Sequence, residues 1–237
     1  MLTTPPKKLA YLANAAPLPC VLQYVKNSWT GGESCPATDV AGEAAENLAL
    51  SVHQCQSGAF ERLIARYEGP LYNYAYGILQ NAFDAQEVVQ DALMRAHRAL
   101  TRQYDEARCA TLALRPWLFR TVRNLSLNQR RSKKSAMSRP LAEFDDERLG
   151  PFVATPPDGS ADADLMRRED AELLGRAMAL LPVDARELIV LRFMEEMPYA
   201  EIAKTLAQSE AALRGKVFRA LKLLREALEK KGVTYAV

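Results

Sequence analysis

Apolar residues recur at a helical spacing from about position 56 onwards. Phe60, Leu63, Ile64 and Tyr67 lie three and four positions apart, as residues on one face of an α-helix do. The stretch "PLYNYAYGIL" then restarts the pattern at Pro70, and proline is favoured in the first turn of a helix. The pattern therefore predicts a helix that ends before Pro70 and another that begins there.

The stretch "DAQEVVQDALMRAHRAL" predicts the next helix, with Asp84 as its cap. Its apolar face consists of Val88, Val89, Ala92, Leu93 and Ala96. The opposite face carries Glu87, Gln90, Asp91, Met94 and Arg95. After a loop at 101–114, the stretch "RPWLFRTVRNLSLNQRRSKK", residues 115–134, forms a further helix.

Helical patterns resume at about Asp164. The stretch "LMRREDAELLGRAMALL" stops at Pro182, and "DARELIVLRFMEEM" stops at Pro198. A short helix, "YAEIAKTLAQ", and a long one from Ser209 to about Lys231 follow. Because no segment alternates as a half-buried strand does, we expect an all-α fold. It comprises two small helical domains joined by a flexible acidic linker, the second being a helix-turn-helix domain.

The last two predicted helices have the pattern of a helix-turn-helix. Ile202 and Leu206 face inward on the short helix, and Ser209 caps the long one. The apolar face of the long helix consists of Leu213, Val217, Ala220, Leu221 and Leu224. Ala211, Arg214, Gly215 and Phe218 point away from that face, with Lys216 and Arg219 on its flanks. In a helix-turn-helix, residues at the start of the second helix contact the edges of the DNA bases, and basic side chains on its flanks contact phosphates. An ordinary helical hairpin with solvated charges has the same sequence pattern.

Composition divides the chain into four parts. Residues 1–50 are rich in Ala, Pro, Gly and Thr without a period, and we expect a poorly ordered extension. Residues 51–134 form the first helical domain, 135–163 are a tether with Pro, Gly and acids, and 164–237 form the second domain.

Charge is segregated along the chain although the net charge is only +2. Residues 108–134 hold eight basic residues and no acid, and 214–231 hold seven bases against two acids. Between them, residues 143–170 hold nine acids against three arginines. Two basic blocks separated by an acidic one predict two contacts with a polyanion.

Several classes of protein are disfavoured by the sequence. No apolar run reaches the ~18 residues of a membrane span, and Pro17 and Pro19 interrupt a signal-like start. The four cysteines form neither a disulfide framework nor a paired metal motif, and His53 with Cys55 is an incidental pair. We expect a cytoplasmic protein that holds no metal or cofactor and is not an enzyme, because no nucleotide loop or catalytic set occurs.

Two groups of motifs, in this order, resemble those of the extracytoplasmic-function sigma factors, the two-domain minimal class of bacterial RNA polymerase initiation subunits. The first comprises an Asp-x-x-Glu-x-x-Gln-(Asp/Glu) helix, matched by "DAQEVVQDALMRAHRAL", and a Trp-Leu-x-x-x-x-Arg-Asn helix, matched by "RPWLFRTVRNLSLNQRR". The second comprises a Leu-Pro start, a Tyr-x-Glu-Ile-Ala helix and a final Arg-Ala, matched by "LLPVDARELIVLRFMEEMPYAEIAKTLAQSEAALRGKVFRALKLLREAL". The resemblance covers both predicted domains, which correspond to sigma regions 2 and 4.

The resemblance implies a role for each face. Residues implied to bind the core polymerase, through its beta and beta-prime subunits, are Asp84, Glu87, Gln90, Asp91, Met94 and Arg95. Residues implied to contact the promoter's minus-ten element are Arg115, Arg120, Arg123, Asn124, Asn128, Arg130 and Arg131. Residues implied to contact the minus-thirty-five element are Ser209, Ala211, Arg214, Gly215, Lys216, Phe218 and Arg219. An anti-sigma factor is a further implied partner, and membrane insertion is not expected.

The helix at 115–134 has two kinds of residue. Trp117, Leu118 and Val122 are predicted to be core, because large apolar side chains are mostly buried. The pocket that captures unstacked bases is predicted to lie in the loop before this helix.

The sequence departs from the family at several positions. Ala207, Ala211 and Ala212 stand where the family usually has Gly, Gly and Thr, and Gly215 replaces a polar residue. These changes leave base preference open, and residues 1–50 have no counterpart, so they are either a regulatory extension or a misassigned start.

Three alternatives remain open at this point. The first is a stand-alone helix-turn-helix regulator with a helical sensor domain, and the second is an enzyme with a helical core. The third is a metal site formed by Asp84, Glu87 and Asp91.

Overall fold

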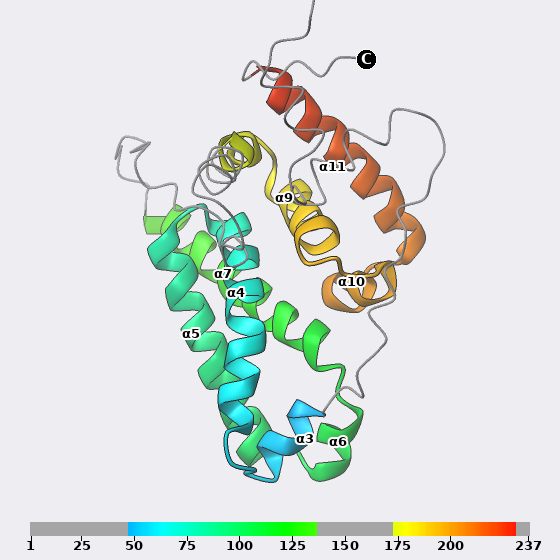
Figure 1. The fold of residues 1–237 in the computed structure, drawn as a ribbon. Coiled ribbons are helices and arrows are strands. Elements are labelled where there is room, and N and C mark those ends of the chain that lie inside the picture. The colour runs from blue at the N-terminus through cyan, green and yellow to red at the C-terminus, as the bar shows by residue number, and fades with distance from the viewer. Residues whose placement is uncertain (1–46, 137–172, 231–237) are drawn as a thin grey trace, which may run out of the picture.

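A computed structural model describes residues 47–136 and 173–230 of the chain. Three long helices, α4 (Ala59–Leu79), α5 (Ala82–Arg98) and α7 (Leu114–Ala136), pack against one another as a bundle (Figure 1). The short helices α3 (Leu48–His53) and α6 (Glu106–Thr111), with the π-helical turn η1 (Ala99–Gln103), close one end of it.

Helix α3 is part of the bundle rather than of the predicted extension. Leu48, Ala49 and Val52 are buried, and the Asn47 side chain accepts a hydrogen bond from Leu50 N at 3.1 Å. The folded unit thus begins a few residues before the predicted boundary at 51, because these apolar side chains find a place in the core.

The prediction of two helices divided at Pro70 is wrong. Helix α4 runs through Pro70 without a break, although an interior proline removes one backbone hydrogen bond. Leu63 before it and Leu71 and Tyr74 after it are completely buried. Packing on both sides of the proline therefore keeps the helix continuous.

The start of α5 also differs from the prediction. Asn81 is the cap, since its side chain accepts a hydrogen bond from Asp84 N at 3.0 Å. Asp84 lies inside the first turn and is buried, and its carboxylate pairs with Lys133 of α7 at 2.6 Å. The predicted cap was therefore wrong by three residues, and Asp84 instead ties α5 to α7.

The predicted loop at 101–114 is mostly helical. Turn η1 continues from α5, and Asp105 caps α6 by accepting a hydrogen bond from Arg108 N at 2.8 Å. Only Leu112 and Ala113 separate α6 from α7. Burial of Cys109 holds α6 against the bundle. Helix α6 is too short to show a helical repeat in the sequence.

The C-terminal unit consists of a helical segment at 173–179 followed by α9 (Val183–Ile189), π-helical turn η3 (Val190–Met194), α10 (Tyr199–Leu206) and α11 (Glu210–Lys230). Pro182 and Pro198 immediately precede α9 and α10, as predicted. The Ser209 hydroxyl accepts a hydrogen bond from Ala212 N at 3.4 Å, which confirms it as the cap of α11. The described residues contain no strand, and the all-α prediction is confirmed.

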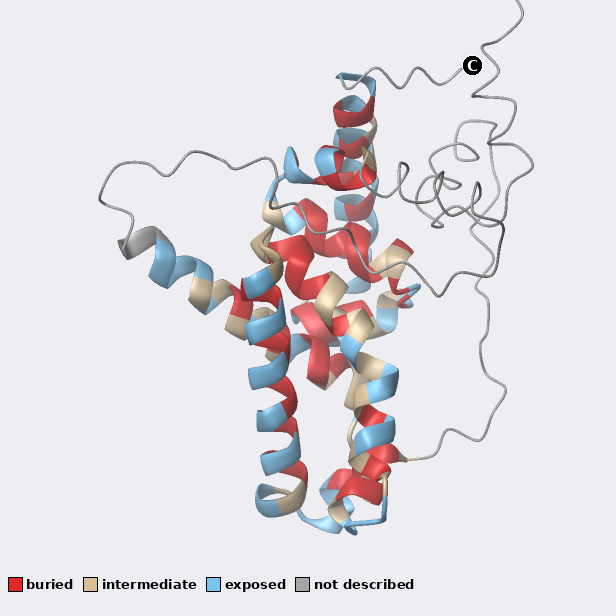
Figure 2. Ribbon diagram, turned by 60° about the vertical axis from the view of Figure 1, so that its left-hand side comes forward, coloured by how far each residue is buried: buried red, intermediate tan, exposed pale blue. Residues whose placement is uncertain are grey.

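The two units share one continuous core (Figure 2). Helix α4 contacts α9 and η3, and α7 contacts α10. A Cβ atom added to Gly77 of α4 would lie 2.9 Å from Val190 Cγ2, so only glycine fits there without a shift. The two predicted domains therefore pack directly on each other, while the predicted tether falls almost entirely outside the described residues.

Candidate nucleic-acid interface

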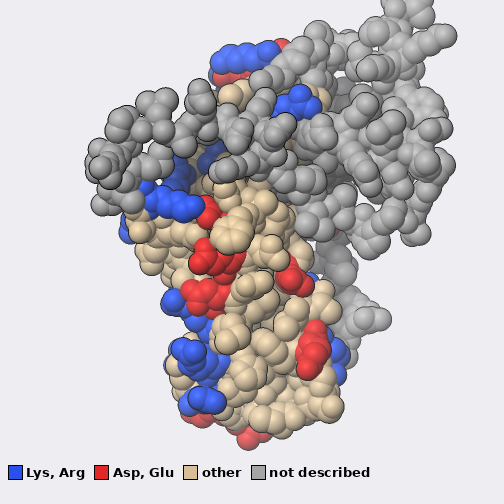
Figure 3. Space-filling model, turned by 90° about the vertical axis from the view of Figure 1, so that its left-hand side faces the viewer, with Lys and Arg blue, Asp and Glu red and all other residues tan. Residues whose placement is uncertain are grey.

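The outward face of α5 is a continuous exposed surface. Glu87, Gln90, Asp91, Met94 and Arg95 are all exposed, as predicted. Met94 is 62 % exposed, and Phe83 at the start of the helix is 77 % exposed. Figure 3 shows acidic side chains along the middle of this face, with basic side chains beside them.

Asp84 does not belong to this surface. It was grouped with the other α5 residues, but its carboxylate lies beneath the Lys133 ammonium and is 8 % exposed. Burial between α5 and α7 gives it a structural role, so its assignment to a partner surface is corrected.

The predicted DNA-binding residues of α7 separate into two groups. Asn124, Asn128, Arg130 and Arg131 are exposed. The side chains of Arg115, Arg120 and Arg123 bind groups of the C-terminal unit, and of these three only Arg120 is also exposed. Three of the seven side chains predicted to contact DNA therefore form hydrogen bonds within the chain.

Arg123 forms a two-point ion pair with Glu187 of α9. The Arg123 Nε and Nη2 atoms donate to the two carboxylate oxygens at 3.0 and 3.3 Å. The Glu187 side chain is only 3 % exposed, and this burial raises the pKa of its carboxyl, opposed by the charge of Arg123. Burial, and then the charge of Glu187, raises the pKa of Tyr74 nearby. Such a pair resists separation, since either partner alone would be a poorly solvated charge.

Arg120 and Arg115 bind backbone carbonyls rather than carboxylates. Arg120 Nη2 donates to the Lys204 carbonyl at 2.7 Å and Nε to the Thr205 carbonyl at 3.4 Å, both in the last turn of α10. Arg115 Nη2 donates to the carbonyl of Glu195, which directly follows η3. The last carbonyls of a helix have no partner within it, and a cation is favourable there. These arginines therefore cap helix ends of the other unit.

Arg186 makes the reciprocal contact from α9. Its Nη2 atom lies 3.5 Å from the carbonyl of Ile78 in the last turn of α4, and Nη1 donates to the Leu181 carbonyl at 3.1 Å. Burial, and then the charge of Arg130, lowers the pKa of Arg186 to about 10. The contacts across the boundary thus come from arginines of both units.

Glu195 is a second buried carboxyl at this boundary. Burial raises its pKa to about 7, and the charge of Arg115 and a hydrogen bond from Asn73 of α4 oppose that rise. Its two polar neighbours both belong to the bundle, so this carboxyl depends on the packing of the two units.

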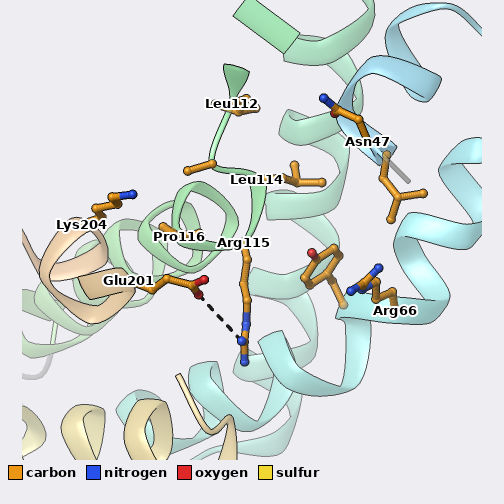
Figure 4. A pocket seen from close by; sticks show the side chains of 11 residues that line it. Asn47, Arg66, Leu112, Leu114, Arg115, Pro116, Glu201 and Lys204 are labelled. Carbon is orange, nitrogen blue, oxygen red and sulfur yellow. Dashed lines mark ion pairs between the residues drawn. The ribbon is translucent and has the colours of Figure 1, made fainter. Parts of the chain in front are cut away.

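A pocket of about 300 Å³ opens beside Arg115 (Figure 4). Its walls come from α3, α4, the 112–116 segment and α10, and three cations, Arg66, Arg115 and Lys204, line it. Glu201 of α10 lies 3.8 Å from Arg115 Nη1, drawn as the dashed line. The pocket includes the segment predicted to capture bases, and α10 forms one of its sides.

The apolar residues of α7 lie where the pattern placed them. Leu118 and Val122 are completely buried, which confirms them as core. Trp117 is half-buried and meets the Tyr104 ring edge-on, with ring centroids 5.9 Å apart. All three serve the packing of α7 rather than an open surface.

The start of α11 projects from the C-terminal unit. Ser209, Ala211, Arg214, Gly215, Lys216, Phe218 and Arg219 are all exposed. Phe218 is 71 % exposed, and the guanidinium of Arg214 lies 4.7 Å from the centre of the Tyr199 ring. Lys216 Nζ donates to Gln208 Oε1 at 2.6 Å. Leu213, Val217, Ala220 and Leu224 are buried on the other face, as predicted.

Two further properties concern the described residues only. Among their helices, none is long and apolar enough to cross a membrane. In the same parts of the chain, no three His, Cys, Asp or Glu side chains gather as metal ligands would, which removes the alternative of Asp84, Glu87 and Asp91. His53 Nδ1 lies 2.9 Å from the Leu100 carbonyl and so has a structural partner.

Comparison with known proteins assigns both units. The Sigma-70 region 2 family matches residues 63–136, and the Sigma-70, region 4 family matches residues 171–224. The ECF RNA polymerase sigma factor SigL of Mycobacterium tuberculosis is 29% identical over 195 residues, which are 82% of this chain and 98% of SigL. SigM of Bacillus subtilis is 25% identical over 173 residues, covering 73% of this chain and 96% of SigM. The chain is an extracytoplasmic-function sigma factor.

Solved structures agree with this family. The structure of CnrH in complex with the cytosolic domain of CnrY is similar over 77% of this chain and 96% of CnrH, with 26% identity and a TM-score of 0.51. RpoE of Bartonella quintana, solved with the anti-sigma factor NepR, has the same fold with 20% identity and a TM-score of 0.55, over 73% of this chain and 98% of RpoE. The match to region 2 also displaces the alternative of a stand-alone regulator, since the N-terminal unit of this sigma factor is not an unrelated sensor domain.

Sequence reasoning missed the residues that join the two units of the sigma factor. Gly77, Arg186, Glu187 and Glu195 had no assigned role, and each lies at the boundary. One signal existed, because Arg186 and Glu187 stand beside the apolar run "LIVL". Charged residues next to a run that is buried on all sides need partners, and here the partners come from the other unit.

Proposed function

We propose that this sigma factor binds core RNA polymerase through α5, reads the upstream duplex through α11 and captures the opened minus-ten strand through α7. The observation that carries this proposal is that these three exposed faces lie on three separate helices. A protein that must hold polymerase and two promoter elements at once needs surfaces that do not overlap.

The α11 face fits duplex recognition. Ala211, Arg214, Gly215 and Phe218 are exposed near the start of the helix, where base edges are met in a helix-turn-helix, and Ser209, Lys216 and Arg219 flank them. Lysine and arginine on the flanks would neutralise phosphates.

The α7 face fits capture of an opened strand. Arg130 and Arg131 would neutralise phosphates, and Asn124 and Asn128 offer amide groups to unpaired base edges. The pocket beside Leu112 and Leu114 supports the proposal that unstacked bases are held next to this helix.

The α5 face fits the core polymerase. Glu87, Gln90, Asp91, Met94 and Arg95 offer acids, an amide, an apolar side chain and a base on one exposed surface. Protein interfaces combine an apolar centre with a polar rim in this way.

The role we propose is non-catalytic, needs no cofactor and takes place where the polymerase is, in the cytoplasm. We assign residues 47–136 to region 2 and 164–237 to region 4, with 137–163 as the linker and 1–46 as an extension. An anti-sigma factor is a proposed further partner, because the related RpoE was solved with one.

Run-off transcription with purified core polymerase and fragmented genomic DNA tests the function. The full chain should co-elute with core and direct initiation at a defined set of promoters, which sequencing of the transcripts would identify. A chain that neither binds core nor initiates from any fragment would refute the proposal.

A further inference from the structure

The pocket beside Arg115 carries more positive charge than its own residues neutralise. Three cations line it, Arg66, Arg115 and Lys204, against the single acid Glu201, which gives it a net charge of +2. Glu201 lies nearest to Arg115, at 3.8 Å from Nη1. Arg66 and Lys204 are exposed, and within residues 47–136 and 173–230 neither forms an ion pair. The pocket therefore offers two cations that an additional anion can bind.

The remaining walls of the pocket are largely apolar. Leu48, Leu112, Leu114 and Pro116 line it between the cations. Figure 4 shows Arg115 between the Glu201 and Lys204 side and the Arg66 side. An occupant that fits such walls combines several negative charges with small or apolar groups.

The chain has a segment of this composition directly beside the pocket. Residues 31–46, "GGESCPATDVAGEAAE", hold four acids and no base, and most of their other residues are small or apolar. We call them the acidic segment. The next residue, Asn47, lines the pocket, and its Nδ2 atom donates to the Ala110 carbonyl at 2.9 Å. The acidic segment is therefore joined to the folded unit at the wall of the pocket.

We propose that the acidic segment docks on this pocket, where its carboxylates pair with Arg66, Arg115 and Lys204, and that it competes there with the opened promoter strand. Carboxylates and phosphates both bind these cations by charge-assisted hydrogen bonds, so the two occupants exclude each other. The competition rests on the function proposed for the pocket, whereas the docking does not.

The length of the tether favours this segment over the other acidic stretch of the chain. The linker leaves α7 at Ala136, about twenty residues and so about 30 Å of helix beyond Pro116. The acidic segment is instead attached at Asn47, in the pocket wall itself. Because effective concentration falls as a tether lengthens, the carboxylates of the acidic segment meet these cations most often.

The natural cysteine of the acidic segment, Cys35, allows the docking to be measured in the full chain. Serine replaces Cys20 and Cys55, and a second thiol is introduced by Ala113→Cys at the pocket or by Ala212→Cys on α11. Both alanines are exposed, and neither change removes a cation. The residues after Cys35 can span about 40 Å when extended, so chain length alone does not confine this thiol to the pocket.

Under diamide, A113C should form a disulfide with Cys35 about tenfold faster than A212C does. Mass spectrometry of tryptic peptides identifies the bond. The preference should be lost at 1 M salt, where charges are screened beyond about 3 Å. Equal rates for the two variants at low salt would overturn the docking. A disulfide between two copies of the chain, seen as a dimer on a non-reducing gel, would assign the pocket to a second copy and would also overturn it.

Removal of the charges of the acidic segment provides a second test. The variant that neutralises the segment is E33Q/D39N/E43Q/E46Q. The matched control neutralises four acids of the linker, E143Q/D145N/D146N/E147Q. Both variants gain four units of positive net charge, so their non-specific attraction to DNA rises equally.

Only the first variant should slow the A113C disulfide to the rate of A212C. Without core polymerase, it should also bind a fluorescent single-stranded oligonucleotide of random sequence about tenfold more tightly than the linker variant does. Equal disulfide rates in the two variants would overturn the docking, and equal oligonucleotide affinities would overturn the competition.

The docking and the proposed function fail differently. If A113C reacts selectively but the unaltered chain fails to initiate with core polymerase, the proposed function is wrong and the docking stands. If the unaltered chain initiates but A113C and A212C react equally, only the docking is wrong.

Discussion

Arg123 and Glu187 lie 64 positions apart in the sequence and face each other across the two units of this sigma factor, with two nitrogen–oxygen contacts of 3.0 and 3.3 Å. The arginine stands in the basic block of α7 and the glutamate beside the apolar run of α9. The two side chains come into contact only when the chain folds.

Removal of the glutamate should weaken the packing of the two units. Glu187→Gln leaves the partly buried Arg123 without a counter-charge, and we expect the free energy of unfolding to fall by about 1 to 3 kcal/mol. Urea denaturation followed by circular dichroism measures it. The double variant R123M/E187L should recover much of the loss, because apolar side chains can replace a buried ion pair; a double variant less stable than E187Q would contradict this account.

Stability should decrease as pH rises from about 5 to 7.5. Burial raises the pKa of Glu195 to about 7 and also raises that of Glu187, so between the unfolded and folded pKa values the folded chain holds protons that the unfolded chain has lost. The stabilisation is complete below the unfolded pKa near 4.5 and is lost as pH passes the folded value. Chemical denaturation at both ends of this range should differ by about 2 kcal/mol. Glu195→Gln should flatten the profile, whereas the exposed neighbour variant Glu196→Gln should keep it.

Ala207→Gly should stabilise the protein. Ala207 ends α10 with a φ of 54°, a left-handed conformation that costs a residue with a Cβ atom about 1 to 2 kcal/mol. Glycine relieves this cost, but it also raises the conformational entropy of the unfolded chain. We therefore expect the free energy of unfolding, measured by urea denaturation, to rise by about 0.5 to 1 kcal/mol. The control Ala200→Gly, exposed inside α10, should lose a similar amount.

Arg214→Ala should relax the upstream sequence preference. The side chain is exposed near the start of α11, and loss of a base-edge contact costs about 1 to 3 kcal/mol of discrimination at one position. Binding of a library of duplexes by the full chain with core polymerase measures this. Lys216→Ala, on the flank, should instead weaken all sequences equally, and equal weakening by R214A would make Arg214 a phosphate contact.

The double variant Q90A/D91A should weaken binding to core polymerase. Both side chains are exposed on α5 and have no part in the core of the bundle, so the thermal midpoint should change little. Titration of labelled protein with core should show at least about a tenfold loss of affinity. Glu226→Ala, exposed on α11, is the matched control, and a variant that binds core normally would remove α5 from the interface.

The helical period determined where side chains are buried within one element. Leu118 and Val122 on α7, and Leu213 and Val217 on α11, are core as predicted, because the 3.6-residue repeat fixes which side chains share a face. The same repeat placed Met94 and Phe218 outside. The repeat is a property of a single helix and does not depend on which helices pack against it.

Predictions that depended on a neighbour were less reliable. Asp84 stands first in its pattern and was expected to be an exposed cap, but the arrival of Lys133 from α7 buries it. Pro70 was expected to begin a helix, yet packing on both sides carries α4 through it. In both cases a contact between distant segments outweighs a local preference.

Helical period, capping residues and motif order are local properties of the chain, so the sequence alone predicts the class of fold, the family and most of the exposed faces. It takes the folded structure to bring Arg115, Arg120 and Arg123 to groups of region 4. A guanidinium can donate to a phosphate, a carboxylate or a helix-end carbonyl. Which of these it binds depends on what folding brings within about 3 Å, the reach of a hydrogen bond.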